Sequence, residues 1–278
     1  DDDESKYCTQ NDACAWRADV PWLRAQGDPR AEWIALAAYA GTPLEREWLA
    51  TELAKGSIRW APLGVWAQDC VFRHGFAVAA TMRITGRGDA RRVADVLGSA
   101  GARLLRELRL VFDARTPARG LDVLAEASFA RLRVLRAAYH RRGNRVIRAL
   151  AGQPALSLEV LDLRGAGVTD DGLVALAGCG ALVGLRTLHL QNNRFTGRGL
   201  AALAASSVLA GVEVLDLRHN AIGADGAAAL AASPHLGGVT TLHLHAGEIE
   251  AAGVRALATS TTLPRELVRL WRAQERAR

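Results

Sequence analysis

The feature that most constrains this chain is a short leucine pattern, LxxLxL, that recurs along its last two thirds. Each occurrence starts 26 or 27 residues after the previous one, and their first residues are Leu105, Leu132, Leu158, Leu185, Val212 and Val239. Fourteen residues after the last four of these starts stand Gly172, Gly199, Gly226 and Gly253, each followed four residues later by a Leu-Ala pair. A fixed period of this length predicts an array of stacked structural units.

Each unit combines a strand pattern with a helix pattern. In LxxLxL the leucines enter the core and the intervening residues face outward, as in a short parallel strand. The alanine-rich segment led by glycine predicts a helix on the other side, and such units are stable only when stacked. This pattern resembles the leucine-rich repeat of the ribonuclease-inhibitor-like type, and repeats three to six match best. In that class an asparagine, here Asn193 and Asn220, satisfies backbone groups where the chain turns. Repeats one and two depart from the pattern, with Asp113 and His140 in place of the asparagine and Val146 in place of the glycine.

The N-terminal part carries a second, different pattern. It contains six of the seven tryptophans, and the segments ADVPWLRAQGDPRAEWIAL (18–36) and FRHGFAVAATM (72–82). These segments resemble the repeat-companion domain that precedes repeat arrays in myxobacterial and planctomycete proteins, with Val20-Pro21 as an insertion and a poor match before Ala18. The resemblance implies a helical cap on the array without enzymatic activity. Thr42-Pro43-Leu44-Glu45 independently predicts a helix start, because it forms a capping box.

The predicted fold class is therefore α/β. We expect a right-handed leucine-rich-repeat solenoid with parallel strands on the concave side and helices on the convex side. The predicted domains are a helical repeat-companion or capping domain at 1–72 and the solenoid at 73–278. Its first strand is predicted at Gly75–Met82, followed by a helix near Arg91–Leu97, and a C-terminal capping helix buries Trp271.

Parallel strands place equivalent positions of successive repeats side by side, so the outward residues form columns. The column between the last two core leucines contains Arg109, Arg136, Asp162, His189, Asp216 and His243. The column two residues further contains Val111, Ala138, Arg164, Gln191, Arg218 and His245. We assign as candidate partner-binding residues on the concave face Asp162, Arg164, His189, Gln191, Asp216, Arg218, His243 and His245.

Three interpretations of these columns compete. They form a cross-strand charge ladder that keeps the strands in register, they bind a partner protein, or His189, Asp216 and His243 converge on a metal ion. The first two are compatible, and we assign neither a metal nor a catalytic residue. Because carboxylates stand on both sides of His189, we expect its pKa to be raised above about 6.5.

The predicted function is that of a non-catalytic protein–protein interaction scaffold. The net charge of +6, almost entirely from arginine, favours an unidentified acidic protein as the partner. The alternatives are a metal-dependent hydrolase that uses the His/Asp column, and a nucleic-acid binder that uses the arginine-rich second repeat, which lacks interleaved aromatic residues. We expect no cofactor and no membrane partner. The cysteines Cys8, Cys14, Cys70 and Cys179 show no metal-binding spacing, which favours reduced thiols and a cytoplasmic location. The chain begins at Asp1 and not at Met, so processing or truncation stays open.

Overall fold

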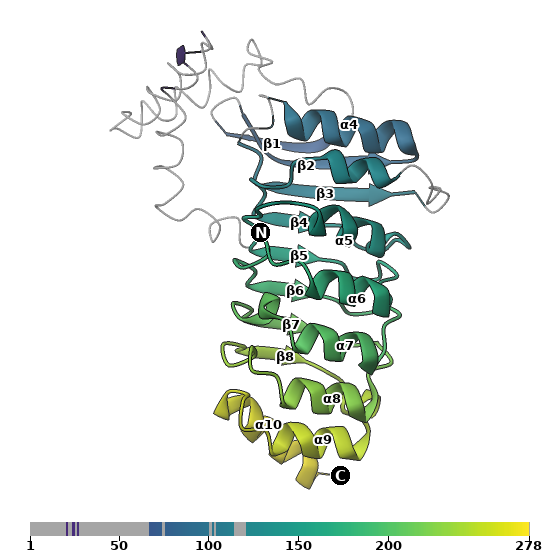
Figure 1. The fold of residues 1–278 in the computed structure, drawn as a ribbon, viewed down its shortest axis with the longest axis vertical. Helices are drawn as coiled ribbons and strands as arrows, with labels where there is room; N and C mark the ends of the chain where they lie inside the picture. Colours follow the sequence, from purple (N-terminus) through teal and green to yellow (C-terminus); the bar gives the residue numbers. More distant parts are fainter. Residues whose placement is uncertain are drawn as a thin grey trace.

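The computed structural model describes residues 67–73, 76–99, 102, 104–113 and 121–277, together with single positions between 21 and 27. In this part of the chain, eight strands form one sheet in chain order. The first two strands are antiparallel to each other, and each later strand is parallel to the one before it. The strands are β1 (Ala67–Arg73), β2 (Phe76–Ile84), β3 (Glu107–Phe112), β4 (Val134–Arg136), β5 (Val160–Asp162), β6 (Thr187–His189), β7 (Val214–Asp216) and β8 (Thr241–His243) (Figure 1).

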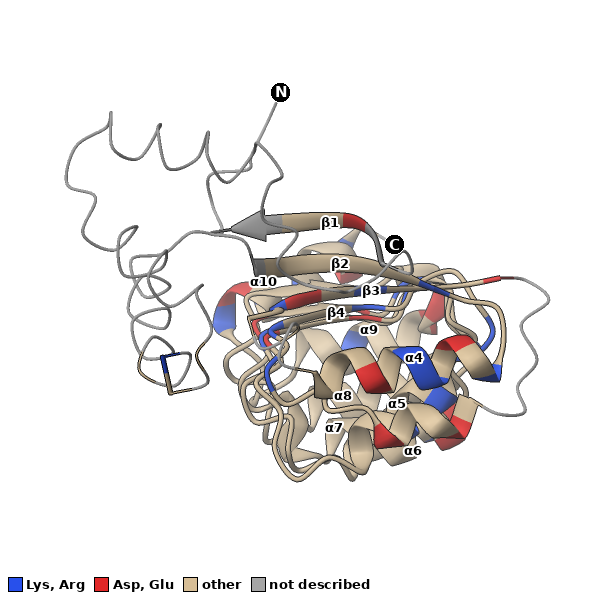
Figure 2. Ribbon diagram, turned by 90° about the horizontal axis from the view of Figure 1, so that it is seen from above, with Lys and Arg blue, Asp and Glu red and all other residues tan. Residues whose placement is uncertain are grey.

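Helices follow the strands and form a second layer. Figure 2, which looks along the stack, shows the strands on one side and the helices on the other. The helices are α4 (Arg87–Gly98), α5 (Gly143–Ala151), α6 (Asp170–Ala177), α7 (Gly197–Ala204), α8 (Gly223–Ala231), α9 (Glu250–Ala258) and α10 (Arg265–Arg276). Short 3-10 helices are η2 (Leu121–Glu126), η3 (Ser207–Leu209) and η4 (Ala246–Glu248). The described fold is thus an α/β repeat solenoid, as the period predicts.

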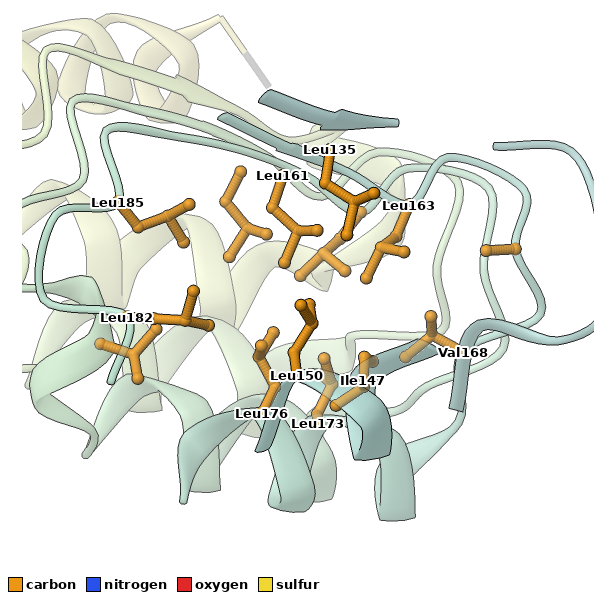
Figure 3. Packing of buried hydrophobic residues seen from close by; sticks show 14 of the residues in the cluster. Leu135, Ile147, Leu150, Leu161, Leu163, Val168, Leu173, Leu176, Leu182 and Leu185 are labelled. Carbon is orange, nitrogen blue, oxygen red and sulfur yellow. The ribbon is translucent and has the colours of Figure 1, made fainter. Parts of the chain in front are cut away.

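The core lies between the two layers. The first residue of each LxxLxL segment is at most 1% exposed, from Leu105 to Val239. Figure 3 shows Leu135, Leu161 and Leu163 of the strand side facing Leu150 and Leu176 of the helices. Since each unit supplies only part of this layer, every buried leucine depends on the neighbouring repeat for some of its contacts.

The repeated glycines allow neighbouring helices to approach closely. A Cβ atom at Gly199 would lie 2.7 Å from the Cα of Asp170, and one at Gly226 would lie 2.8 Å from the Cα of Gly197. Distances this short require the backbone to shift, because the obstructing atoms belong to the preceding helix. The glycine at this position of the period is therefore a packing requirement of the helix layer.

Asparagine side chains join three consecutive repeats at the end of the strands. The Nδ2 of Asn193 donates to the carbonyls of Leu163 and Leu190, at 2.9 and 2.8 Å. Its Oδ1 accepts from the backbone N–H of Val168 at 2.9 Å, and its own N–H donates to Oδ1 of Asn220 at 2.9 Å. These bonds satisfy backbone groups that the turning chain would otherwise leave unpaired.

A second set of hydrogen bonds joins the helix ends. Ser206, Ser233 and Ser260 donate from Oγ to a backbone carbonyl of the preceding repeat, at 2.5 to 2.6 Å. The accepting carbonyls belong to Ala177, Ala204 and Ala231. Cys179 occupies the same position in repeat three, and its Sγ lies 3.6 Å from the carbonyl of Leu150. This buried cysteine is therefore a structural donor in a place that later repeats give to serine.

The two ends of the array differ. At the C-terminus α10 packs on α9 and buries Trp271, which is 4% exposed. At the other end β2 covers the predicted strand from Phe76 on and α4 includes the predicted helix. β1 adds a strand that crosses the predicted boundary at residue 72. The proposed helices of the companion segment lie outside the described residues, so the division at residue 72 stays a prediction. No helix in the described part of the chain has the length and hydropathy needed to span a membrane.

Candidate functional site

The predicted columns lie side by side on the concave face. Strand register pairs Asp162 with His189, His189 with Asp216, and Asp216 with His243. It also pairs Arg109 with Arg136, and Arg136 with Asp162. Backbone register alone therefore places opposite charges next to each other at the centre of the sheet.

The aspartates nevertheless bind arginines of their own repeat, two residues beyond the end of each strand. Asp162 accepts from the Nη2 of Arg164 at 2.6 Å and from its Nε at 2.9 Å, and Asp216 binds Arg218 at 2.6 and 3.0 Å in the same way. Each carboxylate also accepts a backbone N–H of that arginine. The aspartate side chains are 3% exposed and the arginine side chains 38% exposed. The result is two guanidinium groups held in fixed orientation at the surface.

The pKa of His189 shifts in the direction opposite to the predicted one, and burial is the main cause. Burial lowers that pKa below its ordinary value, and the charges of Arg164 and His243 lower it further. The charges of Asp162 and Asp216 raise it, but they do not outweigh burial. The expectation of a raised pKa was therefore wrong, because it counted the two carboxylates and neither the burial of the ring nor the arginines beside it.

Two polar atoms at the centre of the face lack a hydrogen-bond partner among the residues that the structure describes. They are Nδ1 of His189 and Oε1 of Gln191, and both are buried although their residues are only partly so. His189 ends β6 and Gln191 follows two residues later, in the repeat between those that carry Arg164 and Arg218. Buried polar atoms usually have partners, so a rotation of either side chain that brought its polar atom to a bound molecule would supply the missing hydrogen bond.

Metal-ligating side chains gather at a different place from the predicted one. The hypothetical group of His189, Asp216 and His243 is not among the clusters found in the described residues. There, the group of three potential ligands whose ligand atoms lie within 4.8 Å of one another is His219, His245 and Glu248. Sequence analysis included His245 but missed His219 and Glu248, because neither belongs to a strand column.

Charge pairs that the sequence analysis missed lie at the start of the strands. Arg133 pairs with Glu159 at 3.3 Å, and Arg186 pairs with Glu213. In the basic second repeat Arg136 and Arg145 also have acidic partners, Glu107 and Asp122. The basic charge of that repeat is thus partly neutralised within the protein, which disfavours a phosphate-binding surface.

Comparison with known families agrees with the fold. A model described as Leucine Rich repeat matches residues 156–177, 185–204 and 212–231. These are the strand and helix segments of repeats three, four and five. Together, the matches and the sheet with its layer of helices show the α/β solenoid fold of leucine-rich repeats. Such repeats typically provide scaffolds for protein interaction. No curated protein matches the chain.

Proposed function

We propose that this protein binds a partner protein through its concave face and has no enzymatic activity. The proposed contacts are Asp162, Arg164, His189, Gln191, Asp216, Arg218, His243 and His245. The observation that carries the proposal is the pair of buried atoms, His189 Nδ1 and Gln191 Oε1, that have no hydrogen-bond partner among the described residues and belong to the repeat between two fixed guanidinium groups. A partner that satisfied these atoms would gain hydrogen bonds that the free protein lacks.

The arrangement of Arg164 and Arg218 also favours binding. Asp162 and Asp216 hold the Nε and Nη2 atoms, so little side-chain entropy remains to be lost when a partner binds. Because each aspartate neutralises its arginine, the face offers directed N–H donors more than net positive charge. We therefore propose a partner surface rich in carboxylate and carbonyl oxygens, which guanidinium groups recognise well.

The test begins with capture from nuclease-treated lysate of the source cells, followed by binding measurements with the purified partner. Arg164→Ala and Arg218→Ala are expected to weaken binding by about 5- to 30-fold, as for arginines at interface centres. Arg198→Ala is the matched control, since this arginine lies on α7 on the convex side with its side chain 80% exposed. Equal affinity of all three variants would move the binding site away from the concave face.

The measurements also separate the alternatives. A nucleic-acid partner would show a steep dependence of affinity on salt concentration and would be lost after nuclease treatment. A hydrolase would require activity that disappears with substitution of His189, Asp216 or His243.

We further propose the ribonuclease-inhibitor-like repeat type, a bacterial repeat-companion cap and a cytoplasmic location. The support for these is the sequence resemblance and the lack of metal-binding cysteine spacing.

A further inference from the structure

Three potential ligands meet where repeats five and six leave the concave face. His219 lies three residues beyond the end of β7, His245 lies two residues beyond β8, and Glu248 ends η4. The sequence places His219 and Glu248 29 residues apart, and the stacking of the two repeats brings them together. None of the three takes part in the core, and both histidines are exposed.

The glutamate is held in position by the neighbouring repeat. Its Oε1 accepts the backbone N–H of His219 at 2.8 Å and lies 3.6 Å from the Nδ1 of the same residue. Its Oε2 is buried and has no hydrogen-bond partner in the described part of the chain. A buried carboxylate oxygen without a partner is costly unless another group, such as a cation, binds it. The rings of His219 and His245 lie with centroids 4.7 Å apart.

The backbone of His219 adds a second argument. It adopts a left-handed conformation with φ of 60°, and the equivalent residues of repeats three and four are Gly165 and Asn192, at 57° and 59°. The equivalent residue of repeat two, Tyr139, has φ of 58°, so four different residue types occupy this turn in successive repeats. The turn itself therefore does not require an imidazole at this position.

We infer that His219, His245 and Glu248 bind one divalent transition-metal ion of the zinc class. Two imidazole nitrogens and one carboxylate form a ligand set that zinc takes in proteins, with a fourth position open to water. Two nitrogen donors of three disfavour magnesium and calcium, which prefer oxygen.

The geometry requires only small adjustments. Ligand atoms of a tetrahedral site with bonds of about 2.0–2.1 Å are separated by about 3.4 Å. Nδ1 of His219 and Oε1 of Glu248 are already 3.6 Å apart, and all three ligand atoms lie within 4.8 Å of one another. The side chain of His219 is 63% exposed, so its ring can rotate toward the ion without displacing core residues.

The test is a calorimetric titration of zinc chloride into chelator-treated full-length protein at neutral pH. We expect one ion per chain at this site, and an affinity lowered at least about tenfold in each of His219→Asn, His245→Ala and Glu248→Gln. His219→Asn retains the residue type found at the equivalent turn of repeat four, so the variant is expected to fold. His235→Ala is the matched control, because it removes an imidazole from the same part of the array outside the cluster.

A second measurement uses stability. Zinc that binds only the folded cluster should raise the unfolding temperature of the wild type and of His235→Ala, and should not raise that of His245→Ala. Zinc binding of unchanged affinity in all three cluster variants would place the ion elsewhere, for example at cysteines, and would overturn the inference. Loss of binding in His243→Ala but not in His245→Ala would transfer the site to the concave column. If the wild type does not bind zinc, the inferred metal site is also refuted, whereas the proposed partner binding is unaffected.

Discussion

The pH dependence of stability at His140 follows directly from its hydrogen bonds. This residue is 7% exposed and takes the place that Asn193 and Asn220 have in later repeats. Its Nε2 lies 2.8 Å from the carbonyl of Ala137, and its Nδ1 accepts the backbone N–H of Arg142 at 2.9 Å. One nitrogen donates and the other accepts, so the ring is in its neutral form. Burial lowers its pKa to about 4.

The magnitude comes from the difference between the two states. The unfolded chain takes up a proton at His140 below pH 6.5, whereas the folded protein resists it until about pH 4. Each pKa unit corresponds to about 1.4 kcal/mol, so this histidine lowers the free energy of unfolding by about 3 kcal/mol when the pH falls through this range. The contribution of His140 to the free energy of unfolding is fully present above pH 6.5 and decreases as the pH drops toward 4. Below pH 4 this residue causes no further decrease.

The perturbation is His140→Asn. Asparagine cannot take up this proton, and its amide can donate to the carbonyl three residues before it, as Asn220 does to Leu217 at 2.8 Å. The assay is urea denaturation followed by circular dichroism between pH 8 and pH 4. Over this range the free energy of unfolding should decrease by about 3 kcal/mol more in the wild type than in the variant, whatever the difference in stability between the two proteins at pH 8. Parallel curves for the two proteins would refute the reasoning.

Three other predictions concern the array. An NMR titration of His189 should give a pKa below about 6.5, because burial opposes protonation. Gly199→Ala should lower the free energy of unfolding by about 1–3 kcal/mol, because its Cβ would collide with the backbone of Asp170, whereas Gly180→Ala, with open space around it, should cost little. Cys179→Ser should leave stability within about 1 kcal/mol in chemical denaturation, since serine fills this position in later repeats.

Each of these predictions has a contradicting result. A pKa of His189 at or above about 6.5 would mean that Asp162 and Asp216 outweigh burial after all. Similar losses for the alanine variants at Gly199 and Gly180 would show that helix spacing is not the cause. A loss well above 1 kcal/mol for Cys179→Ser would mean that the thiol packs as an apolar group more than it donates.

Much of the fold was predictable from periodicity. The spacing of the leucines predicted every parallel strand from β3 to β8, because the outward and inward positions alternate at fixed places in each repeat. It also predicted which backbone positions lie side by side, such as His189 and Asp216. β1 was not predicted, since it is antiparallel, carries no leucine pattern and comes before the first repeat.

The site was less predictable, for two physical reasons. Asp162 ends β5 and pairs with Arg164 two residues further on, whereas the predicted columns compare positions across repeats and do not describe pairs within one repeat. The cluster at His219 was different. It depends on a left-handed turn and on η4 placing Glu248 against the preceding repeat, and no strand period describes either feature.

The asparagine and serine bonds between repeats also bear on how such a chain can change in length. Asn193 joins its own repeat to the ones before and after it, and Ser206 joins α7 to α6 through contacts that Ser233 repeats one unit later. A duplicated unit of 27 residues would find the same acceptors on both sides. Insertion or deletion of whole units would therefore widen or narrow the concave face without requiring a new kind of contact between repeats. Insertion or deletion of any other number of residues would move these donors away from their acceptors.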